Sequence, residues 1–191
     1  MNKLYLLRHG LTRGNLERLY YGSTDLPLCE EGLRQLNALR EQGGYPSPEG
    51  LLAVTSGMLR TEQTLAAIYG DIAHERWPEL REMDFGAFEM KRYEQLKDRA
   101  DYQSWLSGDM AENHTPGGES EREVFARVLA ALARLQAQPR DVLAVVHGGT
   151  AVAIMCALFP NEGKNRYEWQ PKPGFGYEID MKNLQYRLIP D

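Results

Sequence analysis

A short apolar run turns abruptly basic near the start of the chain, in the stretch Leu4-Tyr5-Leu6-Leu7-Arg8-His9-Gly10. A run this short, without alternating polar residues, is typical of a strand buried on both faces of a parallel sheet. The change from apolar to basic residues marks the end of that strand. Arg8 and His9 are therefore expected at the carboxyl end of a buried strand.

Two further runs repeat this pattern. Residues 51–54 precede Thr55-Ser56-Gly57, and residues 142–146 precede His147-Gly148-Gly149. Between the runs lie segments whose apolar residues recur with the period of a helix. They are residues 33–39, the stretch from Ser56 to Tyr69, residues 119–136 and residues 150–158. This alternation predicts an α/β fold: a three-layer sandwich with a mostly parallel central sheet and helices on both faces.

Local signals set the expected ends of several elements. Ser56 is expected to cap a helix that stops at Gly70, and Pro160 to end the last apolar helix. Residues 177–181 and 184–189 are expected to form a terminal hairpin.

The stretch 82–118 does not fit the alternation. It combines aromatic and charged residues, with two glycines near its end. We interpret it as a largely helical insertion that forms a lid over the site. The 191 residues then make one domain, residues 1–191, which is an ordinary size for a single core.

The net charge and the composition limit the classes of partner that we expect. A net charge of −5 argues against nucleic acid or an anionic membrane as a partner. A small anionic ligand remains compatible with this net charge, because local arginines can outweigh the global sign.

Cys29 and Cys156 fit no metal-ligand pattern and are interpreted as reduced thiols. Neither a signal peptide nor an apolar run of the roughly 20 residues needed to span a membrane is recognised, so we expect a cytoplasmic protein. The sequence does not indicate the oligomeric state.

The ends of the three predicted strands carry the candidate chemistry. Ligands of open α/β sheets bind at the carboxyl ends of the strands, so Arg8, His9 and His147 should converge there. Arg60, one helical turn after Ser56, joins them. Guanidinium groups pair with phosphate oxygens, and helix starts add backbone N–H groups. A neutral imidazole can attack phosphorus, and nearby arginines lower its pKa. The pattern predicts a site for a phosphate group.

Six motifs, in order, resemble those of the histidine phosphatase (phosphoglycerate-mutase-like) superfamily. Any one motif is weak, but the ordered set covers most of the chain and is highly specific. Residues 7–15 resemble RHGxTxxN, residues 22–32 GxxDxPLxxxG, residues 56–61 SxxxRT, residues 80–86 LxExxFG, residues 116–120 PGGES, and residues 147–149 the second-histidine motif.

The resemblance implies a role for each matching residue. His9 would be the nucleophile that becomes phosphohistidine. Arg8, Arg60 and His147 would clamp the phosphoryl oxygens. Glu82 would protonate the leaving oxygen and then take a proton from the attacking water. No metal or other cofactor is implied, because arginines and histidines supply the positive charge. The further expected substrate contacts are Asn15, Tyr21, Gly22 and the backbone of Gly148, with His114 as an open candidate.

The chain departs from the family pattern at three positions. Leu11 stands where Glu or Gln is usual. Cys29 replaces a threonine before a helix, so that helix cap is weakened or lost. Met90 stands where glycine is common, so the lid is expected to take a different path.

Several residues receive an ordinary structural interpretation. Glu79, Asp84 and Glu89 are acids near Glu82, and a lone glutamate in a polar loop is mostly solvated, so only the family match selects Glu82 as the acid. His74 is interpreted as a surface residue, and Trp77, Trp105 and Trp169 as packing residues.

Four alternatives compete with a histidine phosphatase. A metallophosphatase would show HxxxH or DxH, and a serine hydrolase would show GxSxG; neither is present. A phosphoglycerate mutase must hold a second anionic group. Mutases carry a segment that resembles Glu-Arg-x-Tyr-Gly after the acid. Here Met83 and Phe85 replace the basic residue and the tyrosine. A non-catalytic pseudo-phosphatase would lack His9, Arg60 or Glu82.

The sequence therefore predicts a metal-independent phosphomonoesterase acting on a small phosphorylated metabolite. Short family members with PGGES resemble α-ribazole phosphatases of cobalamin synthesis, which makes α-ribazole 5′-phosphate the leading substrate. Sugar phosphates, phosphoglycerate and nucleotide monophosphates are open alternatives.

Overall fold

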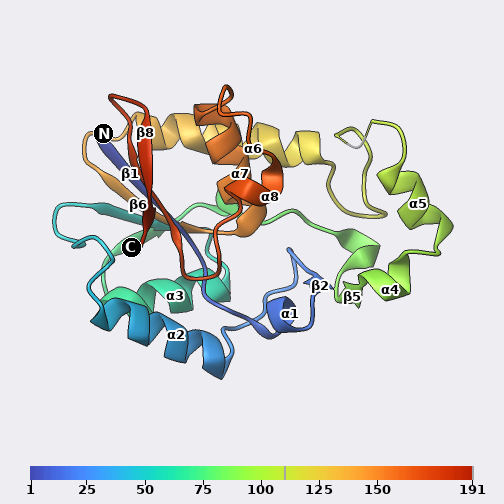
Figure 1. The fold of residues 1–191 in the computed structure, drawn as a ribbon, viewed down its shortest axis with the longest axis horizontal. Helices are drawn as coiled ribbons and strands as arrows, with labels where there is room; N and C mark the ends of the chain where they lie inside the picture. The colour runs from blue at the N-terminus through green and yellow to red at the C-terminus, as the bar shows by residue number, and fades with distance from the viewer. Residues whose placement is uncertain (110, 191) are drawn as a thin grey trace.

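A six-stranded sheet forms the centre of the protein, seen here in a computed structural model that describes residues 1–109 and 111–190. The strand order is β4-β3-β6-β1-β7-β8 (Figure 1). The four strands β1, β3, β4 and β6 pair in parallel, and β7 and β8 are added by antiparallel pairing. The strands are β1 Lys3–Arg8, β3 Leu52–Thr55, β4 His74–Arg76, β6 Val142–Val146, β7 Gly176–Asp180 and β8 Gln185–Ile189. The predicted α/β fold and terminal hairpin are confirmed.

The register of the sheet brings the strand ends together. Arg8 pairs with Val146, and Thr55 pairs with Val145. The residues that follow, including His9 and His147, therefore emerge side by side at one edge. Every residue of β6 is buried, which explains why its sequence is continuously apolar.

Helices cover both faces of the sheet (Figure 1). On one face, α2 (Glu30–Glu41) and α3 (Leu59–Tyr69) pack against Leu143 and Val145 of β6. On the other, α6 (Glu121–Gln136) and α7 (Gly148–Leu158) pack against Ala144 and Val146. Alternate residues of one strand thus serve two cores, and each fully buried aliphatic side chain contributes about 1.5–3 kcal/mol.

The predicted lid segment extends to one side of the sheet (Figure 1). It is less helical than expected, because α4 (Tyr93–Leu96) and α5 (Ala100–Leu106) are short and β5 (Lys91–Arg92) pairs with β2 (Leu19–Tyr20). One 3-10 turn, Pro78–Leu80, precedes the segment, and a second, Gly86–Phe88, lies within it. A separate aromatic cluster holds the segment together: Tyr20, Phe85, Phe88, Leu96, Tyr102 and Trp105.

Two local expectations change. Ser56 does not cap α3; the helix begins after Met58, and the Ser56 hydroxyl accepts the Met58 N–H and bonds to His147 instead. Cys29 does cap α2, through a 3.4 Å bond from the Gly32 N–H to Sγ. Sulfur is a weak acceptor, so this cap is weakened, not lost.

Met90 occupies a position that suits glycine. Its φ is +59°, and its N–H donates to the Tyr20 carbonyl at 2.7 Å. A side chain in this left-handed conformation costs about 1–2 kcal/mol. Among the described residues, no helix combines the length and apolar character needed to cross a membrane.

Candidate active site

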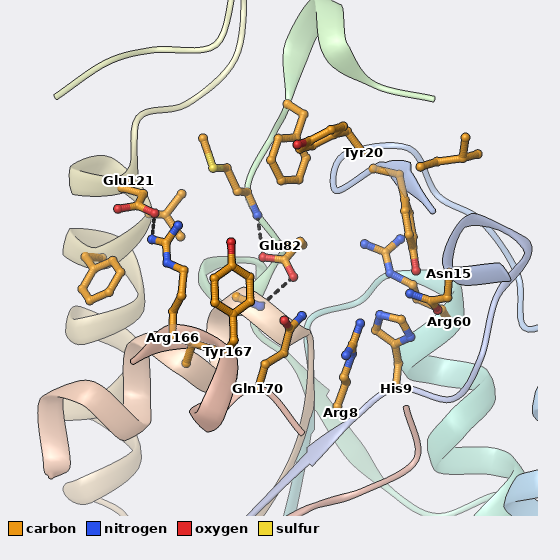
Figure 2. Close-up of a pocket in the computed structure, with 18 of the residues that line it drawn as sticks. Arg8, His9, Asn15, Tyr20, Arg60, Glu82, Glu121, Arg166, Tyr167 and Gln170 are labelled. Atoms are coloured by element: carbon orange, nitrogen blue, oxygen red, sulfur yellow. Dashed lines mark hydrogen bonds and ion pairs between the residues drawn. The ribbon is translucent and has the colours of Figure 1, made fainter. Parts of the chain in front are cut away.

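A cavity of about 430 Å³ opens beside the carboxyl end of β1. Its wall contains six of the predicted site residues: Arg8, His9, Asn15, Tyr21, Arg60 and Glu82 (Figure 2). The other three, Gly22, His147 and Gly148, are buried and are not part of that wall. His114 is not part of it either, and its ring lies beside the Gly118 carbonyl.

His9 presents an unprotonated nitrogen to the cavity. Its Nδ1 lies 2.7 Å from the Gly10 carbonyl oxygen, which only accepts, so Nδ1 carries the proton. Nε2 is then left with a free lone pair. Burial, followed by the charges of Arg60 and Arg8, lowers the pKa of His9 well below 6.5. The side chain therefore has the form a nucleophile requires at neutral pH.

Arg60 is fully buried and held by three acceptors. Its Nη1 donates to the Thr24 carbonyl at 3.0 Å, its Nη2 to the Gly22 carbonyl at 2.7 Å, and its Nε to Nδ1 of His147 at 3.1 Å. The nearest carboxylate, Asp25, is 4.0 Å away and half-exposed. The positive charge of Arg60 is thus held mainly by neutral groups.

Arg8 adds a second charge with unused donors. Its Nη1 donates to the Pro171 carbonyl at 2.9 Å, but its buried Nε has no partner among the described residues. A buried donor without a partner costs about 1–3 kcal/mol. Two guanidinium groups with free N–H donors beside His9 therefore suit a phosphate dianion.

His147 supports Arg60 from behind. Nδ1 accepts from Arg60, and Nε2 lies 2.8 Å from the Ser56 hydroxyl. Burial and the charge of Arg60 lower the pKa of His147 well below 6.5, so the ring is neutral. In this tautomer His147 positions Arg60, and a direct clamp on the phosphoryl oxygens stays a prediction.

Asn15 and Tyr21 line the same end of the cavity. Oδ1 of Asn15 accepts both the N–H and the hydroxyl of Thr12, at 3.0 Å each, so its Nδ2 is the group available to a ligand. The ring of Tyr21 lies under the Arg60 guanidinium, 5.1 Å away, and its hydroxyl bonds to Thr12 at 2.7 Å.

Glu82 faces the same space as His9 (Figure 2). Its Oε2 accepts the Gly149 N–H at 2.8 Å, and its Oε1 accepts the Met83 N–H at 3.0 Å. A Cβ on Gly149 would lie 2.4 Å from Oε1, so only glycine admits the carboxylate here. Gly149, the next residue of the same motif, therefore contacts the candidate acid, and the substrate contact expected of the Gly148 backbone stays a prediction. A Cβ on Gly148 would instead meet Gln170, at 2.4 Å.

Arg127 of α6, which belongs to none of the motifs, fixes the backbone that carries Glu82. Its Nε and Nη2 donate to the Glu119 carboxylate at 2.7 and 2.8 Å. The remaining donors bind the carbonyls of Glu79, Arg81 and Glu82, at 3.0, 2.6 and 3.0 Å. All five guanidinium N–H groups are therefore used.

Glu89 fixes the backbone of the loop below Arg60, residues 22–24, whose carbonyls bind the Arg60 guanidinium. Its carboxylate accepts the N–H groups of Gly22, Ser23, Thr24 and Phe85 and the Thr24 hydroxyl. Asp84 is also engaged, by the Ser23 hydroxyl and the Gly86 N–H. Glu89 thus orients the two carbonyls that hold Arg60.

The far part of the cavity is apolar. Its wall includes Trp105, which was expected only to pack, and nine other largely apolar residues: Leu19, Tyr20, Met83, Phe85, Leu106, Val124, Phe125, Val152 and Tyr167. Among the described residues, no group of three or more His, Cys, Asp or Glu side chains is arranged to hold a metal ion.

The cavity thus brings the Arg8 and Arg60 guanidinium groups beside a neutral His9 at the strand ends of an α/β fold. The chain belongs to the histidine phosphatase superfamily (branch 1), whose family model matches residues 4–186. The family predicted from the motifs is confirmed.

Known relatives carry two different names. A protein of Enterobacter sp. (strain 638) named "Probable phosphoglycerate mutase GpmB" is 33% identical over 165 residues, covering 83% of this chain and 74% of the relative. A solved phosphoglycerate mutase from Thermus thermophilus is 32% identical, with a TM-score of 0.75 and coverage of 98% of this chain and 97% of that one. A candidate alpha-ribazole-5'-P phosphatase from Escherichia coli K-12 is 26% identical, with a TM-score of 0.83 and coverage of 98% and 95%.

The buried histidines predict a loss of stability on acidification. His9 and His147 have folded pKa values below 6.5, so the unfolded chain takes up protons first as the pH falls. Each such group then costs about 1.4 kcal/mol per pH unit below 6.5. His74 acts in the opposite direction: hydrogen bonds to Ile72 and Glu62 overcome its partial burial and raise its pKa. We expect urea unfolding at pH 5.5 to give a free energy about 2 kcal/mol lower than at pH 7.5. His9→Asn should remove roughly half of this difference; an unchanged difference would contradict the assignment.

The five hydrogen bonds of the Arg127 guanidinium predict that the stability of the fold is sensitive to substitution at this position of α6. Arg127→Lys keeps the charge but leaves partly buried carbonyls without donors and loses the paired bonds to Glu119, so we expect the free energy of unfolding to fall by about 2 kcal/mol. Arg134→Lys on the same helix is the control, because Arg134 bonds only to the Glu79 side chain and stacks on Trp77. Equal effects of the two substitutions in urea unfolding would refute the assigned role of Arg127.

Proposed function

We propose that this chain hydrolyses phosphomonoesters through a phosphohistidine intermediate on His9. One observation carries the proposal: a buried, neutral His9 lies between two guanidinium groups with unused donors, and the Glu82 carboxyl faces the same cavity. The arrangement supplies a nucleophile, an anion clamp and a proton donor.

The reaction has two steps on these residues. Nε2 of His9 attacks phosphorus, the bond from phosphorus to the ester oxygen breaks, and protonated Glu82 gives its proton to the leaving alcohol. Glu82, now ionised, takes a proton from water. That water attacks phosphorus, the P–N bond breaks, and inorganic phosphate leaves neutral His9. Arg8 and Arg60 stabilise the charge on the equatorial oxygens in both steps.

Mutase activity is the second candidate, since two of the relatives above are named phosphoglycerate mutases. A mutase must hold the carboxylate of its substrate while it phosphorylates a second hydroxyl. Beyond Arg8 and Arg60, the cationic group in the described cavity wall is Arg166, and it is paired with Glu121. Met83 and Phe85 make the adjacent wall apolar. These features favour hydrolysis.

The leading specific substrate is α-ribazole 5′-phosphate. The PGGES-like segment supports this choice, as does the name of the Escherichia coli structure. The aromatic wall around Tyr20, Phe85 and Trp105 also suits an ester that carries an aromatic base.

The function is tested by phosphate release from a panel of monoesters in the presence of EDTA. The panel includes α-ribazole 5′-phosphate and 3-phosphoglycerate. We expect release from at least one ester and an acid-labile phosphoenzyme, with both abolished in His9→Ala. Robust turnover by His9→Ala would exclude His9 as the nucleophile. Exchange of 2- and 3-phosphoglycerate without phosphate release would establish the mutase instead.

Glu82→Gln separates the acid from the nucleophile. Glutamine has no proton of suitable acidity, so turnover of alkyl phosphates should fall by about 10²–10⁴. Turnover of p-nitrophenyl phosphate should fall much less, because its leaving group needs no proton. Equal losses on the two esters, measured as kcat, would argue against Glu82 as the acid.

A further inference from the structure

An ion pair lies on the wall of the cavity, in the far, largely apolar part that the leaving group of the proposed reaction would occupy. Glu121 and Arg166 contact each other there, and both line the cavity (Figure 2). Glu121 is the first residue of α6, and Arg166 is the first residue of α8 (Arg166–Trp169). Their side chains are 27% and 45% exposed, so a ligand in the cavity can reach them.

The pair is not needed to cap either helix. Ser120 caps α6 in a reciprocal box with Glu123, and Asn165 caps α8 in a reciprocal box with Glu168. Exposed ion pairs between surface side chains add little stability, commonly below about 1 kcal/mol. The position of this pair on a cavity wall therefore calls for an explanation other than support of the helices.

The rest of this compartment is apolar and aromatic. Phe125 and Val124 come from α6, Val152 from α7, and Tyr20, Phe85 and Trp105 from the cluster beside the lid. A free guanidinium at this place would attract a carboxylate or a second phosphate on the substrate. Glu121 cancels that attraction and repels the same group.

We infer that Glu121 sets the charge selectivity of the site: by neutralising Arg166, it restricts the leaving group to uncharged, ring-bearing alcohols and rejects esters with a second anionic group. The inference rests on the proposed phosphatase function and names its substrate class. It also predicts that Arg166 can bind a second anionic group of a substrate once its ion pair with Glu121 is removed.

A matched pair of esters tests the inference. Phenyl phosphate and 4-carboxyphenyl phosphate share one ring and differ in the carboxylate. In Glu121→Gln, the kcat/KM ratio of the carboxylated ester to phenyl phosphate should rise about fivefold over the parent, the size of a modest change in charge pairing. Because ratios are compared between variants, the difference in leaving-group acidity cancels. The rise should disappear in Glu121→Gln/Arg166→Gln, where no cation is left to be freed.

The control is Glu31→Gln on α2. Glu31 is also a first-turn glutamate in an ion pair, 2.6 Å from Arg34, but it lies outside the cavity wall. Its ratio should equal that of the parent. No rise in Glu121→Gln, or an equal rise in the double variant, would overturn the inference.

Binding of phenylphosphonate and 4-carboxyphenylphosphonate, measured by calorimetry on the same variants, gives a readout independent of turnover. The affinity ratio should follow the same order. If the parent hydrolyses neither these two esters nor any ester of the panel above, the proposed function fails, and the phosphonate ratios alone then decide whether Glu121 masks Arg166.

Discussion

The buried guanidinium of Arg60 is the constraint on which the site depends. An ion taken out of water costs several kcal/mol unless its donors are satisfied. Here the partners are two loop carbonyls and one imidazole nitrogen, and none of them cancels the charge. The two chain segments that supply these partners, the loop 22–24 and the end of β6, must therefore meet α3 at one point, and that point is the end of the cavity where His9 lies.

The network around Arg60 also fixes two tautomers. His147 can accept from Arg60 only if its proton is on Nε2, where the Ser56 hydroxyl receives it. His9 donates from Nδ1 to its neighbouring carbonyl and so keeps Nε2 free. Burial holds both rings neutral, with lowered pKa values. One charged group and two neutral ones thus occupy adjacent positions, so the positive charge of Arg60 is not cancelled within this network.

The sequence predicted the parts of this arrangement that leave a local signal. Apolar runs located β1, β3 and β6, and the motifs located His9, Arg60 and Glu82. The edge strand β4 was missed because it is three residues long and mostly exposed, and β2 and β5 because two-residue strands have no period. Ser56 was found for the wrong reason: the residue after a strand can cap a helix or bond across the sheet, and the sequence does not distinguish the two.

Arg127 and Glu89 could not be predicted for a different reason. Their partners are mostly backbone groups, 45 or more residues away for the bonds to Glu82 and Gly22, and any residue supplies a backbone carbonyl or N–H. A side chain that organises backbone therefore carries no pairwise signature, although the geometry of the site depends on it.

The two ends of the cavity are built from different material. The phosphate end rests on strand termini, helix starts and glycines that admit only hydrogen, so few substitutions are tolerated there. The leaving-group end is assembled from lid aromatics and the outer turns of α6 and α8, with an ion pair that neither helix cap requires. Glu89 links the two ends, because its carboxylate accepts both the Gly22 N–H in the loop below Arg60 and the Phe85 N–H beside the aromatic cluster. One side chain therefore fixes backbone geometry at both ends of the cavity.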